Sequence, residues 1–253
     1  MARTFVITGS ASGIGKATAA RLQDKGGKVI GVDLHDADII ADLGTQAGRA
    51  AMIAQVKTMA PDGIDGVLAG AGISDASRPA DTIAINFFGA KETLEGLRPQ
   101  LRGPRPRAVT ICSTSVVMPF DQMTLELCLA GDEEGAKRRA QEIGGFLYGG
   151  TKRALWLWLR KAALRPEWAG AGIMLNAVAP GAIMTPMTAP LLDDPAMVEL
   201  LKKSNPIAVE NFAPAEDVAE FLDFLLNFEG NYILGQSFFI DGGTDAIIRP
   251  EHV

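Results

Sequence analysis

The chain has 253 residues, of which 24 are Lys or Arg and 30 are Asp or Glu, giving a formal net charge of −6. This acidic balance, without a long basic run, argues against a nucleic-acid-binding protein, and no apolar stretch reaches membrane-spanning length. Cys112 and Cys128 lack the spacing of a metal or redox site. The N-terminus enters a strand without a secretory signal, so we expect a cytoplasmic protein with free thiols and no bound metal.

Apolar, β-rich segments alternate with helix-prone segments along the whole chain. Strands are predicted near residues 3–8, 28–33, 38–41, 65–70, 107–112, 172–178 and 236–240, and helices near 13–25, 46–60, 79–100, 146–165 and 214–228. Most of these strands are almost continuously apolar, as expected for a parallel sheet covered on both faces. We therefore predict a single α/β domain over residues 1–253, with a Rossmann-type, doubly wound, parallel seven-stranded sheet flanked by helices.

A glycine-rich turn follows the first predicted strand and precedes the first predicted helix, over residues 8–15. Gly9 would permit the tight turn, Gly13 would let the backbone approach a pyrophosphate, and Gly15 would let the helix pack closely. The helix N-terminus would offer free N–H groups to phosphates. This context favours a dinucleotide site, with the pyrophosphate near Gly13 and Ile14, over a βα turn that is glycine-rich by chance.

Asp33 ends the second predicted strand, 18 residues after Gly15, which is where a dinucleotide fold carries its ribose-binding carboxylate. A carboxylate accepts hydrogen bonds from the ribose hydroxyls and repels a 2′-phosphate. The neighbouring Ser10, Ser12 and Leu34 supply no cation for that phosphate. The sequence therefore predicts NAD (NADH) as the cofactor in preference to NADP. The alternative is that Asp33 only caps the strand or its turn.

Tyr148 and Lys152 are four residues apart on a predicted helix, so both side chains lie on one face. An ammonium beside a phenol favours the phenolate and would lower the tyrosine pKa from about 10. A phenol tuned in that way can transfer a proton near neutral pH.

Together, the glycine turn and the Tyr-x-x-x-Lys pair resemble the short-chain dehydrogenase/reductases, in motif order, motif distance and chain length. The resemblance extends over essentially the whole chain. Further matches are Asp42–Leu43, the turn Ala69–Gly70–Ala71–Gly72, Asn86, Pro180–Gly181 and Asp241–Gly242–Gly243. The family turn usually begins with Asn, so Ala69 loses one side-chain hydrogen bond near the fourth strand.

This resemblance implies a catalytic set of Asn86, Ser113, Tyr148 and Lys152. Ser113 would hold the substrate oxygen, Tyr148 would exchange the proton, Lys152 would bind the nicotinamide ribose, and Asn86 would hold its helix for a water-linked proton path. Ser115 is a rival for the serine role, whereas Thr114 should point the other way. The implied cofactor contacts are Gly9, Ser12, Gly13, Ile14, Gly15, Asp33, Leu34, Asp42, Leu43, Ala69, Gly70, Ala71, Tyr148, Lys152, Pro180, Gly181, Ile183 and Thr185.

Ser113 and Tyr148 are 35 residues apart, which is more than in most of the family, so residues 119–142 form a predicted insertion. Its first half has apolar residues that need burial, and its second half is charged and helix-prone. It could change subunit assembly or roof the substrate pocket. A similar insertion marks the bacterial 3α-hydroxysteroid dehydrogenase/carbonyl reductase branch, and residues 31–43 and 241–250 also resemble that branch.

Residues 184–210 are rich in Met, Leu and Pro, and the resemblance implies a mobile lid, with ordinary packing of a helix onto the body as the alternative. Such a lid suits a bulky apolar ketone or secondary alcohol. The favoured prediction is a steroid, terpenoid or aryl ketone substrate. A smaller or acyl-thioester substrate, or a non-catalytic dinucleotide sensor, remains as an alternative. The resemblance to this family implies a homodimer or homotetramer, with Trp156 or Trp158 at the subunit interface.

Overall fold

The computed structural model describes residues 2–143 and 147–251. Its main sheet contains β1 (Thr4–Thr8), β2 (Lys28–Asp33), β3 (Ile39–Ile40), β4 (Gly66–Ala69), β5 (Arg107–Ile111), β6 (Met174–Pro180) and β9 (Ser237–Ile240). Their order is β3-β2-β1-β4-β5-β6-β9, and every pairing is parallel. The predicted doubly wound, seven-stranded sheet is therefore confirmed, with strand bounds within two residues of those expected.

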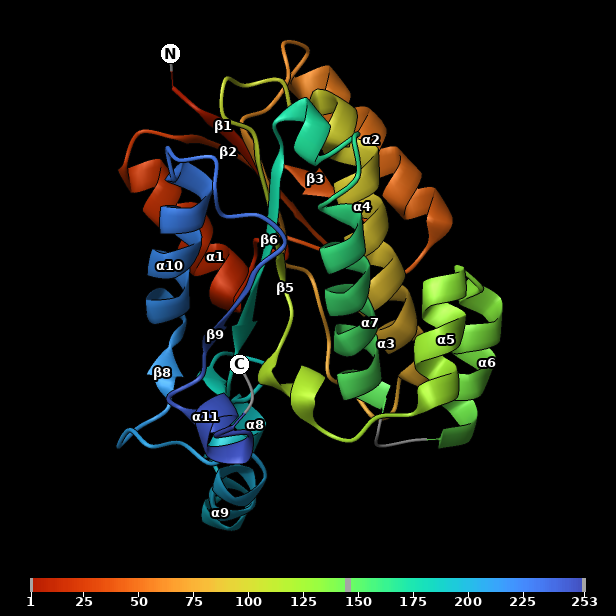
Figure 1. Cartoon of the computed structure of the whole chain (residues 1–253), viewed down its shortest axis with the longest axis vertical. Coiled ribbons are helices and arrows are strands. Elements are labelled where there is room, and N and C mark those ends of the chain that lie inside the picture. Colours follow the sequence, from red (N-terminus) through yellow and green to blue (C-terminus); the bar gives the residue numbers. More distant parts are fainter. Residues whose placement is uncertain (1, 144–146, 252–253) are drawn as a thin grey trace.

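Helices cover both faces of this sheet (Figure 1). One face carries α1 (Gly13–Asp24) and α10 (Ala215–Asn227), and the other carries α2 (Gln46–Met59), α4 (Ala90–Leu97) and α7 (Leu147–Ala162). Residue 146, where the last of these was predicted to begin, lies outside the described residues. Along β1, Val6 packs into one core while Phe5 and Ile7 pack into the other, because successive side chains of a strand point to opposite faces.

The helix predicted over residues 79–100 is one helical run that changes type. It contains α3 (Pro79–Ile83), a π-helical segment (Ala84–Gly89), α4 and a 3₁₀ turn (Arg98–Gln100). Asn86 lies in the π-helical segment and is fully buried. Single π turns inside helices are often found at functional sites.

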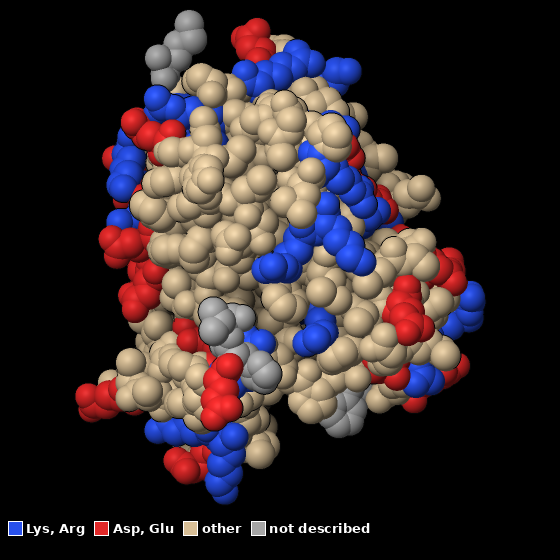
Figure 2. Space-filling model, viewed as in Figure 1, with Lys and Arg blue, Asp and Glu red and all other residues tan. Residues whose placement is uncertain are grey.

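The insertion forms two helices, α5 (Gln122–Ala130) and α6 (Glu133–Ile143). They lie beside α3 and α7 on the right of Figure 1, and α5 packs against α7 while α6 packs against α3. Leu125 and Cys128 of α5 are buried, as their apolar character predicted, whereas Leu129 is exposed. Figure 2 shows side chains of both charges mixed over this part of the surface. The insertion therefore extends the helical layer.

The segment after β6 leads away from the sheet. It contains β7 (Ile183–Met184), which pairs with β8 (Ala213–Pro214), and the helices α8 (Ala189–Leu192) and α9 (Pro195–Ser204); α11 (Thr244–Ile248) lies nearby. Neither α8 nor α9 has a buried residue. These two helices therefore do not pack as body helices do, and the lid stays a prediction.

The two tryptophans of α7 differ in environment. Trp158 is buried in the core, whereas Trp156 is partly buried, with the guanidinium groups of Arg153 and Arg160 5.9 and 5.7 Å from its ring. Figure 2 shows Lys and Arg side chains gathered on the face where α7 lies. An interface at Trp156 stays a prediction.

Within the described ranges 2–143 and 147–251, no helix has both the length and the apolar character needed to cross a bilayer. The same residues contain no group of three or more His, Cys, Asp or Glu placed to hold a metal ion.

Candidate active site

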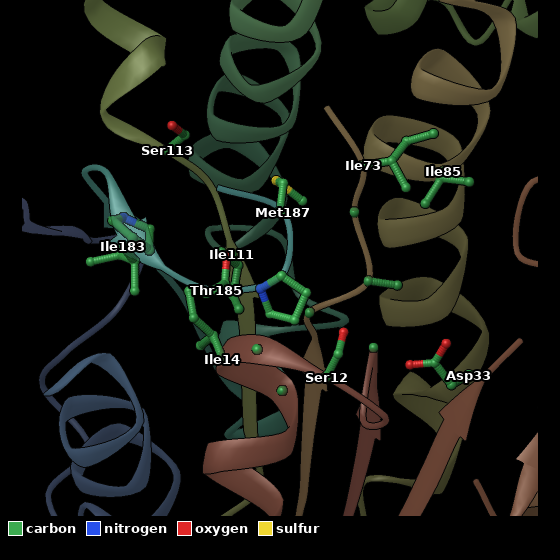
Figure 3. A pocket seen from close by; sticks show the side chains of 18 of the residues that line it. Ser12, Ile14, Asp33, Ile73, Ile85, Ile111, Ser113, Ile183, Thr185 and Met187 are labelled. Atoms are coloured by element: carbon green, nitrogen blue, oxygen red, sulfur yellow. The ribbon is translucent and has the colours of Figure 1, made fainter. Parts of the chain in front are cut away.

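A cavity of about 300 Å³ opens at the carboxyl ends of the central strands. Its walls come from the turn after β1, the end of β2, the turns after β4 and β5, α7 and the segment after β6. Strand order reverses between β1 and β4, and open α/β sheets bind their ligands at such a point. Figure 3 shows Asp33 and Ser113 at opposite ends of this cavity, with Ser12, Ile14 and Thr185 between them.

The glycine turn forms the floor of the cavity. A Cβ on Gly15 would collide with the Gly9 carbonyl oxygen, so glycine is required where α1 meets the turn. Gly13 has a φ of +50°, which also favours glycine, and a Cβ there would lie 3.3 Å from Thr185 Cγ2. Ser12 caps α1 with an extended backbone and no side-chain capping bond. The Ser12 side chain therefore leaves the first-turn N–H groups of α1 uncapped, and Gly13, Ile14 and Gly15 line the cavity, as a pyrophosphate site would need.

The Asp33 carboxylate lies at the far end of the cavity and is partly exposed. Its Oδ2 accepts a hydrogen bond from the Ala11 N–H at 2.9 Å, and its Oδ1 accepts one from the Leu34 N–H at 2.7 Å. Asp33 thus stabilises the turn and also presents a negative charge to any ligand. Among the described residues that line the cavity, Lys152 is the one Lys or Arg. A 2′-phosphate would meet a carboxylate at this end and no cation.

Asp42 and Leu43 line the cavity next to Asp33. Asp42 Oδ1 accepts a hydrogen bond from the Gly44 N–H at 2.8 Å, and the Leu43 side chain is buried. Their position in the cavity beyond Asp33 suits the adenosine end of a dinucleotide.

Two side chains, the Thr8 hydroxyl and the Asn86 amide, fix the turn after β4. Thr8 Oγ1 accepts hydrogen bonds from the N–H groups of Gly70 and Ala71, both at 3.1 Å. Asn86 bonds both main-chain groups of Ile73, accepting from its N–H and donating to its carbonyl at 2.8 Å each. The turn is thereby held with its backbone against the cavity.

Two predicted site residues do not line the cavity. Ala69 is the last residue of β4 and is buried in the core, where its carbonyl accepts from Thr110 Oγ1 at 3.0 Å. Asn86 is buried behind the turn and reaches the cavity only through Ile73. Its amide bonds the backbone of Ile73 and not that of its own helix, a contact that the sequence did not predict.

Ser113, Tyr148 and Lys152 meet at the other end of the cavity. Ser113 follows β5, and its Oγ accepts a hydrogen bond from the Ser115 N–H at 3.1 Å. Lys152 is 3% exposed, and its Nζ donates to the Ile111 carbonyl at 2.9 Å and lies 5.8 Å from the centre of the Tyr148 ring. The predicted one-turn spacing does bring the phenol and the ammonium to the same wall.

The predicted effect of Lys152 on the pKa of Tyr148 is wrong for this structure. Burial raises the pKa of Tyr148 to about 12; its hydrogen bond with Ser113 acts in the opposite direction, and the nearby Cys112 adds to the rise. Burial also lowers the pKa of Lys152 to about 8. Desolvation disfavours both charged forms and is the largest cause of each shift in pKa. Tyr148 is therefore a protonated phenol at neutral pH, ready to act as a proton donor.

Ser113, and not Ser115, faces the cavity. Ser115 does not line it, and its buried hydroxyl has no hydrogen-bond partner among the described residues. Thr114 points away, as predicted, with its Oγ1 3.3 Å from both the Pro180 carbonyl oxygen and Asp241 Oδ2. These contacts connect the end of β5 to the end of β6.

The remaining wall comes from the segment after β6. Pro180, Gly181, Ile183 and Thr185 all line the cavity, as predicted. Thr188 closes this segment, because its Oγ1 accepts from the Thr185 N–H at 3.0 Å and donates to the Ile183 carbonyl at 2.5 Å.

Several wall residues were not predicted as site residues: Val32, Ala41, Gly72, Ile73, Ile85, Ile111, Cys112, Pro186, Met187 and Thr188. Most of them are apolar neighbours of the predicted residues, so adjacency to the motifs was the available signal. Burial raises the pKa of the Cys112 thiol to about 12, so it stays protonated beside Lys152.

Comparison with known proteins agrees with this geometry. Residues 3–125 match the family model described as short chain dehydrogenase, and residues 134–245 match one described as enoyl-(acyl carrier protein) reductase. The chain is 38% identical to the 3-alpha-hydroxysteroid dehydrogenase/carbonyl reductase of Comamonas testosteroni, over 97% of this chain and 98% of that protein. The chain belongs to the short-chain dehydrogenase/reductase family.

A solved structure of this family is similar throughout. The crystal structure of the 3-alpha-hydroxysteroid dehydrogenase from Pseudomonas sp. B-0831, complexed with NADH, has a TM-score of 0.91 and 36% identity, and covers 99% of this chain and 100% of that one. The cis-4-hydroxycyclohexanecarboxylate dehydrogenase of Sinomonas cyclohexanicum is 30% identical over 97% of both chains. The predicted resemblance to the hydroxysteroid dehydrogenase/carbonyl reductase branch is confirmed.

Membership of this family makes the protein an oxidoreductase of alcohol and carbonyl groups that uses a nicotinamide dinucleotide. The cavity agrees with that assignment, since the glycine turn, the Asp33 carboxylate and the side chains of Ser113, Tyr148 and Lys152 all line it.

Proposed function

We propose that this protein interconverts a secondary alcohol and a ketone on a bulky, apolar, cyclic substrate, with NAD(H) as the cofactor. One observation carries this proposal: Ser113, Tyr148 and Lys152 line the same cavity as the glycine turn and Asp33. A dinucleotide that lies between the two ends would bring its nicotinamide to the three catalytic side chains.

Bound NADH would supply the hydride in ketone reduction and bound NAD would accept it in alcohol oxidation, while the protein supplies proton transfer and orientation. Ser113 Oγ donates a hydrogen bond to the substrate oxygen and holds the carbonyl for reaction. In ketone reduction, the oxygen of the substrate takes the proton of the Tyr148 phenol as hydride arrives at carbon. Lys152 would bind the nicotinamide ribose. In alcohol oxidation the phenolate takes the proton back, and the positive charge of an oxidised nicotinamide nearby would stabilise that phenolate.

The apolar character of the lid supports the proposed substrate class. Met184 and Met187, at the start of the segment, are 46% and 45% exposed, and Leu200 on α9 is 56% exposed. Methionine adapts its shape to irregular apolar ligands, so closure of the lid over a cyclic ketone would cover these side chains. With Lys152 as the one cation in the described cavity wall, an acidic or acyl-thioester substrate has less support.

The cofactor preference rests on Asp33, because a carboxylate at the ribose end repels a 2′-phosphate. Asp33→Ala should narrow the gap between the catalytic efficiencies with NAD and with NADP. A wild-type protein that already prefers NADPH would contradict this part of the proposal.

Two further points of the proposal concern the setting of the enzyme. We propose a homodimer or homotetramer, which light scattering of the purified protein would distinguish from a monomer. Cys112 and Cys128 are both buried and unbridged, which supports work in a reducing compartment such as the cytoplasm.

The decisive experiment compares wild type with Tyr148→Phe. Oxidation of NADH, with NADPH in parallel, would be followed with steroid, monocyclic terpenoid, aryl and small aliphatic ketones. We expect turnover of cyclic ketones by wild type, and a loss of about 10³-fold or more in Tyr148→Phe with NADH binding unchanged. Equal turnover in both proteins would refute the acid–base role. If wild type binds NADH but turns over none of these ketones, a dinucleotide sensor or a charged substrate would be favoured.

A further inference from the structure

Arg49, on α2, is a buried cation that connects three separate parts of the chain. Its side chain is 1% exposed. Its Nε donates to Glu92 Oε2 on α4 at 2.6 Å, and its Nη2 donates to Glu133 Oε2 on α6 at 2.6 Å. Its Nη1 donates to the Leu43 carbonyl at 3.2 Å and lies 3.4 Å from Glu133 Oε1. One guanidinium therefore joins the loop after β3 to α4 and to the insertion.

Opposite charges surround Arg49. Glu133 also forms an ion pair with Lys137 Nζ at 2.8 Å, and Lys137 in turn pairs with the exposed Glu134 at 3.2 Å. Removing a charged pair from water costs free energy that its attraction often only offsets. Such a pair is weak evidence for stability, but it fixes geometry closely, because a guanidinium donates in a rigid planar fork.

The carbonyl that Arg49 holds belongs to Leu43, a wall residue of the cavity at its adenosine end. Gly89 lies close to Leu43, since a Cβ on Gly89 would be 3.1 Å from the Leu43 carbonyl oxygen and 3.4 Å from Leu43 Cβ. Thr45 Oγ1 also donates to the Asp42 carbonyl at 3.1 Å and accepts from the Gly48 N–H at 3.0 Å. The backbone of the Asp42–Leu43 loop thus has little freedom while Arg49 stays in place.

Glu133 is the first residue of α6 and lies inside the insertion. None of residues 119–142 lines the cavity, so the insertion does not roof it. The Glu133–Arg49–Leu43 chain of hydrogen bonds nevertheless gives the insertion a direct route to the cavity wall. We propose that Arg49 is a positioning residue for the adenosine half of the dinucleotide site. Glu133 of the insertion keeps the Arg49 side chain in the position that this role needs. This inference rests on the proposed function, because it takes Leu43 as an adenosine contact.

Binding of two fragments of the dinucleotide distinguishes a positioning role of Arg49 from a general effect on protein stability. ADP-ribose lacks the nicotinamide, and reduced nicotinamide mononucleotide lacks the adenosine. Calorimetric binding of each probe would be measured for wild type, Arg49→Lys and Glu133→Gln. The control is Arg139→Gln, which removes another ion pair of the insertion, between Arg139 Nη2 and Asp121 Oδ1 at 2.6 Å, without a contact to Leu43.

We expect Arg49→Lys to raise the Kd for ADP-ribose by roughly tenfold, since a lysine cannot donate to all three partners at once. Glu133→Gln keeps the shape of the side chain but loses its charge, and should raise the same Kd by about three- to tenfold. Neither variant should change the Kd for the mononucleotide by more than about twofold, and Arg139→Gln should change neither Kd.

Three outcomes would count against these ideas, and they can be told apart. Equal ADP-ribose binding by wild type and both variants would overturn the positioning role while leaving the dinucleotide site intact. An equal loss in Arg139→Gln would show that any loosening of the insertion weakens binding, which also overturns it. A wild-type protein that binds neither ADP-ribose nor NADH would refute the proposed function itself, and the inference with it.

Discussion

Replacing Lys152 with methionine should stabilise the folded protein while removing its activity. Lys152 carries a buried ammonium whose hydrogen bond goes to the Ile111 carbonyl, and no ion pair to it is found among the described residues. Burial lowers its pKa from 10.5 to about 8. A pKa that is lower in the folded state means that folding disfavours the charged form, here by about 3 kcal/mol at neutral pH.

The pH dependence of this cost has a definite sign. Below pH 8, Lys152 is protonated in both the folded and unfolded states, so the folded protein bears the whole cost. Between pH 8 and 10.5 the folded protein releases the proton and the unfolded chain keeps it. Because the unfolded state then binds more protons, the free energy of unfolding rises with pH across this window, and the cost disappears near pH 10.5.

Methionine has a similar length and no charge, so Lys152→Met removes the cost and leaves the Ile111 carbonyl without its donor. That lost hydrogen bond subtracts about 1 kcal/mol. The variant should therefore be more stable than wild type by about 2 kcal/mol at pH 7, and no more stable than wild type at pH 10.5.

Urea unfolding of both proteins without cofactor, at pH 7, 9 and 10.5 and at one protein concentration, measures this difference in the free energy of unfolding. Turnover with NADH and a cyclic ketone should be lost in the variant. A variant that is less stable than wild type by the same amount at every pH would show that Lys152 carries no desolvation cost. The reasoning from burial would then be wrong.

Two further predictions concern the serine and asparagine of the site. Ser113→Ala should lower kcat by about 10²–10³-fold, whereas the kcat of Ser115→Ala should stay within about threefold of wild type, since of these two only Ser113 faces the cavity. Similar losses of kcat in steady-state assays of both variants would contradict the assignment of Ser113. Asn86→Ala leaves both main-chain groups of Ile73 unpaired and should cost about 2–4 kcal/mol of unfolding free energy and weaken NADH binding. The control is Thr93→Val on the same helical run, which removes a buried hydroxyl that has no partner among the described residues. Urea unfolding should show this control to be as stable as wild type or more stable. Equal free energies of unfolding for the two variants would refute the role of Asn86.

The sheet and the cofactor turn could be predicted because their causes are local. A strand such as β6, buried along its whole length, must be apolar throughout, and a turn that approaches its own helix needs glycine at Gly15. Each of these requirements leaves a mark in a few consecutive residues. The family resemblance then added Ser113 and Asn86, which no local pattern could have distinguished from other Ser and Asn residues.

What the sequence could not predict depends on partners far apart in the chain. The partners of Arg49 lie at positions 43, 92 and 133, and nothing around position 49 indicates that this arginine is buried. The packing place of the insertion is settled by the faces of α3 and α7. The pKa of Tyr148 was expected to fall because only the helical spacing to Lys152 was visible. The degree of burial, which reverses the effect, depends on the whole fold.

The π-helical segment at Ala84–Gly89 lets one helical run pack against two different sets of elements. A π turn holds one residue more than an α turn, so the angular phase of the helix shifts by about 100° across it. Upstream of the shift, α3 faces α6 and α7; downstream, α4 faces α2 and β4. A straight α-helix would present a single continuous stripe to one set of neighbours. Deleting any one residue of the segment would rotate one half against the other, and either the insertion or the sheet would lose its matching face.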